Sequence, residues 1–212
     1  MNILQRITFL AGSLLTGSIL TGTGVSAQPL RETPQISLPE FSRQRIQHQR
    51  IIGYSLGGYA LANIAVSGIA SGQTTGETKQ FHRMNVYWNL VNLGIAGFGL
   101  LGARKQNRIA GPPNTESLKD AVARHNQMKK ILAINAGLDV VYLAGGAYLA
   151  NRNSNPETAD RNRGFGKAII VQGGFLLVFD VVNYLIFKNR DSDRDALIQA
   201  TPNGVGLVLP VR

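Results

Sequence analysis

The sequence predicts an all-α fold: a bundle of four transmembrane helices, arranged as two helical hairpins and preceded by an N-terminal signal segment. Four apolar stretches, at residues 51–71, 84–103, 131–150 and 168–187, each have about the length that a helix needs to cross a bilayer. Charged residues make up only 16% of the chain and lie almost entirely between these stretches. The mean hydropathy of -0.01 therefore hides a strong segregation of polar and apolar segments.

The N-terminal segment, residues 1–27, has the layout of a secretory signal peptide. A basic residue precedes an apolar core at 7–20, and small residues at 25–27 suit cleavage. An uncleaved anchor is the alternative, because the apolar core is long. Residues 28–43 contain three prolines and no periodicity, which predicts a linker with a helix starting near Ser42.

The transmembrane domain is predicted to occupy residues 44–190, with a polar tail at 191–212. A turn rich in Gly and Thr joins the first two stretches. A long polar loop with a Gly-Pro-Pro break precedes the third, and a helix start is expected there at Asn114 or Ser117. Ser117 and Asp120 have capping-box spacing. Similar residues open corresponding stretches of the two hairpins, which suggests a tandem repeat of one hairpin.

The formal net charge of +10 does not indicate nucleic acid, because no basic helix face or recognition motif accompanies it. Basic loops beside membrane spans explain it, and they predict contact with anionic lipid headgroups. The chain has no cysteine, and its three histidines show no metal-ligand spacing. We therefore expect no metal and no cofactor. The expected partners are the lipid bilayer and a second copy or another membrane protein.

Two signals disagree about orientation. With four spans, the side that holds the linker, the long middle loop and the tail carries fifteen Lys and Arg residues, against six on the other side. This bias favours a cytoplasmic position for the side that carries the fifteen basic residues. A cleaved signal peptide would instead deliver the mature N-terminus to the outside. Two alternatives would resolve the conflict: an N-terminal segment inserted as a fifth span, or a topology set by the signal peptide that tolerates the charge bias.

Polar residues in the spans form a candidate site. Counted from the more basic side, Asp139 lies 8 residues into its span and Asp180 lies 7, so the two carboxyls are expected at the same depth. Intramembrane polar groups turn inward because they are costly against lipid. The complete candidate site comprises these two acids, three asparagines at nearby depths, and Gln172, which shares a helix face with the second acid at i, i+8: Asp139, Asp180, Asn135, Asn183, Asn92 and Gln172.

No Lys or Arg in the spans can neutralise Asp139 and Asp180. If the two carboxyls meet, they cannot both remain ionised alone, so they share a proton or hold a cation. The alternative is that the acids and amides act only as hydrogen-bonded contacts between helices. Depth also matches Asn135 with Asn183, which predicts a second level of paired side chains.

An enzyme is not expected. Residues 53–57 match the G-x-S-x-G pattern of serine hydrolases, but that motif requires a strand, a strained turn and a helix. Here it lies within an apolar helical stretch. Residues 164–167 lack the spacing of a phosphate-binding loop. Glycines in the spans are expected to allow close helix packing: the GxxxG pair Gly53 and Gly57, and Gly94, Gly97, Gly137, Gly145, Gly146, Gly173 and Gly174.

The stretches FHRMNVYWNLVNLGIAGFG and VQGGFLLVFDVVNYL resemble segments of an uncharacterised family of small multi-pass bacterial membrane proteins. The resemblance extends from about Arg45 to Arg190 and implies residence in the bacterial cytoplasmic membrane. It implies no activity. Two roles remain: a small transport or sensing module that binds a proton, a cation or a small polar ligand, and a structural or assembly subunit of a membrane complex without a ligand.

Overall fold

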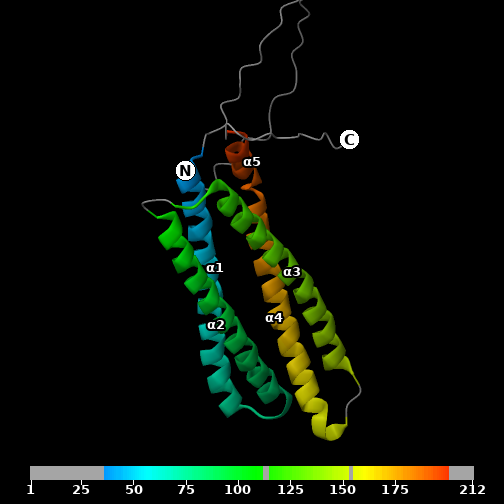
Figure 1. The fold of residues 1–212 in the computed structure, drawn as a ribbon. Coiled ribbons are helices and arrows are strands. Elements are labelled where there is room, and N and C mark those ends of the chain that lie inside the picture. Colours follow the sequence, from blue (N-terminus) through cyan, green and yellow to red (C-terminus); the bar gives the residue numbers. More distant parts are fainter. Residues whose placement is uncertain (1–35, 112–114, 153–154, 201–212) are drawn as a thin grey trace, which may run out of the picture. The chain divides into compact units, whose positions relative to one another are not determined.

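The computed structural model describes residues 36–111, 115–152 and 155–200. The predicted signal peptide and the C-terminal GVGLVLPVR stretch lie outside these residues. The described part of the chain is entirely helical and contains no strand, as the sequence predicted. Four long helices are followed by one short helix (Figure 1).

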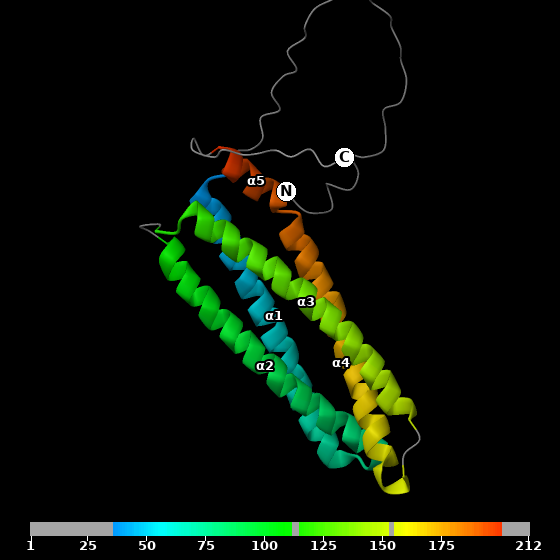
Figure 2. The same cartoon turned by 45° about the vertical axis from the view of Figure 1, so that its right-hand side comes forward.

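The helices are α1 (Leu38–Gln73), α2 (Gly76–Ala110), α3 (Leu118–Asn151), α4 (Pro156–Lys188) and α5 (Asp191–Gln199). α1 pairs with α2 and α3 pairs with α4, so the two predicted hairpins form. α2 and α4 pack against each other and join the hairpins, whereas α1 and α3 make little contact. Figures 1 and 2 show both hairpin turns at one end, and α5 with the start of α1 at the other.

The helix starts follow local capping chemistry. Ser37 caps α1 by accepting a hydrogen bond from the Glu40 amide, and proline follows in the first turn. α1 therefore begins at Leu38, within the predicted linker and before the predicted start at Ser42. Ser117 caps α3 through the amide of Asp120, which confirms the predicted capping box in part. Gly76 opens α2 with a φ of 55°, a conformation that glycine adopts without strain.

Three segments are long and apolar enough to cross a membrane: Gly76–Ala110, Leu118–Asn151 and Thr158–Gln199. α1 is equally long, but glycine, serine and tyrosine lower the hydropathy of its apolar stretch. The predicted spans of about 20 residues are thus parts of helices of 33 to 36 residues: the middle of α2 and the C-terminal parts of α1, α3 and α4. At 1.5 Å per residue these helices are about 50 Å long, so their ends project beyond an apolar layer about 30 Å thick.

Glycines permit the closest helix crossings, and only some of them are the predicted ones. A Cβ on Gly166 of α4 would lie 2.6 Å from the Gly146 carbonyl oxygen of α3. A Cβ on Gly164 would lie 2.7 Å from the Phe81 amide nitrogen of α2. Helix backbones can approach so closely only where the side chain is a hydrogen. The prediction holds for Gly146, for Gly53, where an added Cβ would lie 2.7 Å from Leu100, and for Gly173, where it would lie 3.4 Å from the Asp139 carbonyl oxygen. It is wrong for four glycines at which an added Cβ would meet nothing within 4 Å: Gly94, Gly97, Gly137 and Gly145.

A buried ion pair lies at the end of the bundle opposite the hairpin turns. We call this end the charged end; its polar cluster comprises Arg45, Gln106, Glu116 and Arg124. Arg45 Nη2 donates to both carboxylate oxygens of Glu116, at 2.7 and 2.8 Å, and its Nη1 donates to Gln106 Oε1 at 2.5 Å. The side chains of Arg45 and Glu116 are 0% and 1% exposed. Arg124 approaches Glu116 from α3 at 3.4 Å. This cluster ties α1 to α2 and to the start of α3.

The residues predicted as a polar tail begin with α5, which is held to α3 by polar contacts. Asp191 Oδ1 lies 3.0 Å from His125 Nε2, and Asp191 Oδ2 accepts a hydrogen bond from Lys129. Arg194 donates to Asn126 at 2.9 Å. The His125 ring is fully buried, 5.3 Å from Phe41 and 5.6 Å from Phe187 between ring centroids. The start of α5 is therefore part of the folded unit.

We expect the bundle to lose stability as pH falls below about 6.5. Burial lowers the pKa of His125, an effect that the Asp191 carboxylate opposes and the charges of Lys129 and Arg194 reinforce. His125 lies outside the predicted span 131–150. The unfolded chain then binds the proton more readily than the folded chain, so acid favours unfolding. Thermal unfolding in detergent between pH 7.5 and 5.5 should show this slope, and His125→Gln should flatten it. An equal slope in both proteins would contradict the assignment.

Candidate functional site

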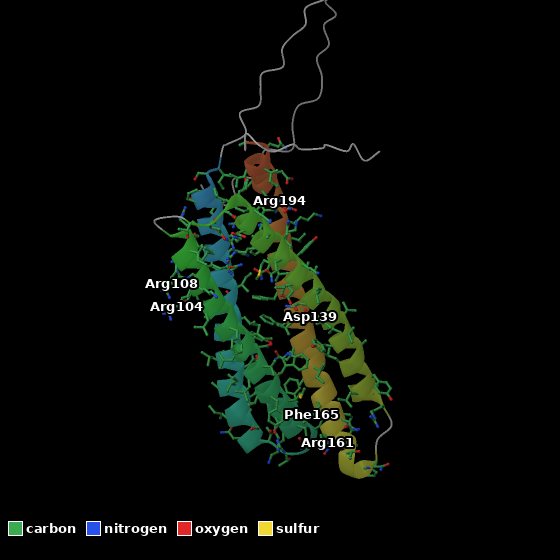
Figure 3. All side chains as sticks on the ribbon, viewed as in Figure 1. Arg104, Arg108, Asp139, Arg161, Phe165 and Arg194 are labelled. Atoms are coloured by element: carbon green, nitrogen blue, oxygen red, sulfur yellow. The ribbon has the colours of Figure 1, made fainter. Side chains whose placement is uncertain are left out.

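A cavity of about 210 Å³ lies in the middle of the bundle, where α2, α3 and α4 face one another. Its wall is mostly apolar and aromatic, with Trp88 and Tyr142 in an edge-to-face pair at 4.9 Å between ring centroids. Four polar side chains line it: Asn92, Asn135, Asp139 and Asp180. Figure 3 shows Asp139 at mid-height, far from both ends of the bundle.

The two acids are brought together as depth counting predicted. Asp139 and Asp180 are 3% and 6% exposed, and their carboxyl groups are close enough to interact. Asp139 Oδ2 is buried and has no hydrogen-bond partner. Among the described residues that line the cavity, none is Lys, Arg or His. Two adjacent carboxyls without a countercharge favour the binding of a positive charge between them.

Gln172 lies outside this cavity, in a hydrogen-bonded network that joins three helices. Its Nε2 donates to Asn85 Oδ1 at 2.7 Å, and its Oε1 accepts from the Tyr59 hydroxyl at 3.2 Å. Asn89 Nδ2 donates to the Asn85 carbonyl, and Asn92 Nδ2 lies 3.4 Å from Asn89 Oδ1. The polar stripe of α2 thus connects Gln172 to the edge of the cavity. These amides satisfy one another, so they act as contacts between helices.

Asn183 forms its side-chain hydrogen bonds with His48 and Phe179 rather than with Asn135, its predicted partner. Asn183 Oδ1 lies 3.0 Å from His48 Nε2, and its Nδ2 donates to the Phe179 carbonyl at 2.7 Å. Burial, followed by the charge of Arg190, lowers the pKa of His48, so the ring is neutral at pH 7 and Nε2 carries the proton. Asn183 therefore fixes α4 to α1, and the predicted level of paired asparagines does not form.

A second cavity of about 270 Å³ adjoins the first and extends toward the charged end. Both cavities are lined by Asn135, Asp180 and Phe179. The second continues to Gln106, whose Oε1 accepts the hydrogen bond from Arg45, and to Gln49, whose buried Oε1 has no partner. The second cavity is therefore a mostly apolar route from the carboxyl pair toward the charged end, with four polar side chains along it: Gln49, Gln106, Asn135 and Asp180.

Of the six predicted site residues, four line the central cavity, while Gln172 and Asn183 lie in neighbouring hydrogen-bonded contacts. The prediction missed two side chains that hydrogen-bond to these residues: His48, which contacts Asn183, and Tyr59, which donates to Gln172. His48 lies just outside the predicted first span, so a depth count that began at the span boundary could not include it.

Neither the curated proteins nor the solved structures contain a match to this chain. A family model described as a family of unknown function (DUF6992) matches residues 55–181. The matched segment includes Asp139 and Asp180 together with the helices that enclose the central cavity. It ends before Asn183 and begins after Arg45, so the charged end lies only partly within it. The match covers more than half of the chain, and the protein therefore belongs to this family of unknown function.

Proposed function

We propose that the chain is an integral membrane protein of four membrane-crossing helices that binds a proton or a small cation between Asp139 and Asp180. The proposed role is non-enzymatic, in transport or sensing. The buried Asp139 Oδ2, which has no hydrogen-bond partner and lies beside a second carboxyl in a cavity, is the observation that carries the proposal.

The distribution of side chains supports residence in a bilayer. Large apolar residues cover the outside of the helices, including Phe98 at 78% exposure. Asn89 and Gln172 are instead fully buried. This is the reverse of the pattern in soluble proteins and suits a lipid environment, in which polar groups must pair internally. The same pattern supports membrane crossing by α1, since Val66 and Ile69 are 66% and 65% exposed.

Electrostatics supports a positive ligand. Two carboxylates in a low-dielectric interior repel each other strongly, and no basic side chain of the described cavity wall offsets that repulsion. A proton shared between Asp139 and Asp180, or a monovalent cation, removes one charge, whereas a divalent cation neutralises both. Asn92 and Asn135 add amide oxygens of the kind that complete a shell around a hard cation. The route toward the charged end supports entry of the ligand from that side.

The single tryptophan of the chain, Trp88, lines the same cavity and provides a direct readout. The test is a titration of the reconstituted protein with protons, and with Na⁺, K⁺ and Mg²⁺ at constant ionic strength, followed by fluorescence. The wild type is expected to respond to protons or to one cation, and Asp139→Asn with Asp180→Asn is expected to abolish the response. Asp160→Asn with Asp195→Asn removes two exposed carboxylates elsewhere and should leave the response unchanged.

The outcomes separate the two roles. A response that survives in the Asp139→Asn and Asp180→Asn double variant would exclude the carboxyl pair as the site. A wild type that responds to none of the four ions would favour a structural subunit, in which the polar layer only sets helix register. Circular dichroism of each variant separates loss of binding from loss of folding.

A further inference from the structure

A separate groove of about 400 Å³ lies on the outside of the first hairpin, between α1 and α2. It shares no lining residue with the two interior cavities. Two arginines and four apolar or small residues line it: Arg50, Tyr54, Gly97, Leu100, Leu101 and Arg104. The groove therefore combines positive charge with an apolar floor.

The two arginines offer unpaired charge at the level where the predicted spans begin and end. Arg50 directly precedes the first predicted span, and Arg104 directly follows the second. Within the described part of the chain, neither has an ion pair or a side-chain hydrogen bond, unlike Arg45 one turn away. Figure 3 shows Arg104 and Arg108 projecting from the outer side of α2, away from the other hairpin. A membrane-surface guanidinium of this kind is suited to pair with phosphate.

The apolar floor extends from the arginines toward the middle of the bundle. Gly97 lies seven residues from Arg104, which is about 10 Å along the helix axis. Tyr54 and Leu101 are 61% and 59% exposed, so the floor faces the lipid in a bilayer. A ligand that fits must carry its negative charge at the membrane surface and an apolar chain below it.

We propose that this groove binds one anionic phospholipid, with its phosphate between Arg50 and Arg104 and an acyl chain along Leu100, Leu101 and Gly97. The apolar floor favours a lipid over free phosphate, which would contact only the arginines. Residence of the hairpin in a bilayer is taken from the proposed function, but the carboxyl pair has no part in this binding. Binding of an anionic lipid would also give two of the many basic residues at this end, Arg50 and Arg104, a specific ligand.

The test is native mass spectrometry of protein released from nanodiscs that contain equal amounts of phosphatidylglycerol and phosphatidylcholine. The wild type should retain one phosphatidylglycerol per chain. Arg50→Gln with Arg104→Gln should reduce that retention about 10-fold, since each basic residue near an anionic surface contributes substantially to binding. Lys119→Gln with Lys130→Gln removes two exposed charges at the same end of the bundle and should retain the lipid.

Three results would overturn the proposal: equal retention in the arginine variant, an equal loss in the lysine control, or displacement of the lipid by millimolar inorganic phosphate. Leu101→Asn keeps both arginines and should weaken retention through the floor alone. Asp139→Asn with Asp180→Asn should retain the lipid, so failure of the carboxyl site leaves this result unaffected. Flotation of every variant with vesicles separates a lost lipid site from a failure to insert.

Discussion

Replacement of Arg45 by methionine is expected to lower the free energy of unfolding by about 3–5 kcal/mol. The guanidinium forms two hydrogen bonds to Glu116 and one to Gln106, and it is fully buried. Its removal leaves the Glu116 carboxylate buried without its bidentate partner, and Arg124 lies farther away, at 3.4 Å. Most of the loss comes from the poorer compensation of this buried charge rather than from the lost contact itself.

Unfolding titrations in detergent micelles, followed by circular dichroism, measure the effect. Arg45→Met combined with Glu116→Leu should recover much of the lost stability, because a buried ion pair and an apolar pair of similar volume are often equivalent. Arg43→Met is the matched control on the same helix turn, since Arg43 forms an exposed ion pair with Glu40. If the double variant is no more stable than Arg45→Met, the explanation by a poorly compensated buried charge is wrong.

Replacement of Gly166 by alanine is expected to destabilise the second hairpin by about 1–3 kcal/mol, through overpacking of α3 against α4. The added Cβ would lie 2.6 Å from the Gly146 carbonyl oxygen, and backbone atoms cannot yield as a flexible side chain does. The helices must separate, and the contacts along both lose packing. The apparent unfolding midpoint in detergent measures this cost.

Gly145 and Gly146 provide a matched pair of neighbours for this prediction. A Cβ on Gly146 would lie 2.9 Å from the Gly166 carbonyl oxygen, whereas a Cβ on Gly145 would meet nothing within 4 Å. Gly146→Ala should therefore destabilise the protein. Gly145→Ala should leave stability unchanged or raise it, because alanine is the better helix former. Equal effects at the two positions would show that this crossing is not the tight contact that the geometry indicates.

The helical class and the pairing of hairpins followed from the length and spacing of apolar stretches. Helix ends were harder to predict, because capping and tertiary contacts, rather than hydropathy, determine them. α1 begins at Leu38 and α4 at Pro156, each well before its apolar stretch, since hydrogen bonding continues through polar residues. Which glycines pack closely also depends on helix rotation. Gly145 and Gly146 are adjacent in sequence, yet only Gly146 faces the backbone of α4, whereas Gly145 faces open space.

The sequence by itself determined that two acids lie at one depth without a countercharge, because helical rise converts residue number into position along the axis. Only the tertiary structure decided which side chains share a cavity, since that depends on how each helix is rotated about its axis. Asp139 and Asp180 meet, whereas Asn183 is taken by His48 and Gln172 by Asn85. The unpartnered Asp139 Oδ2 and the adjoining route toward Gln106 are likewise consequences of packing.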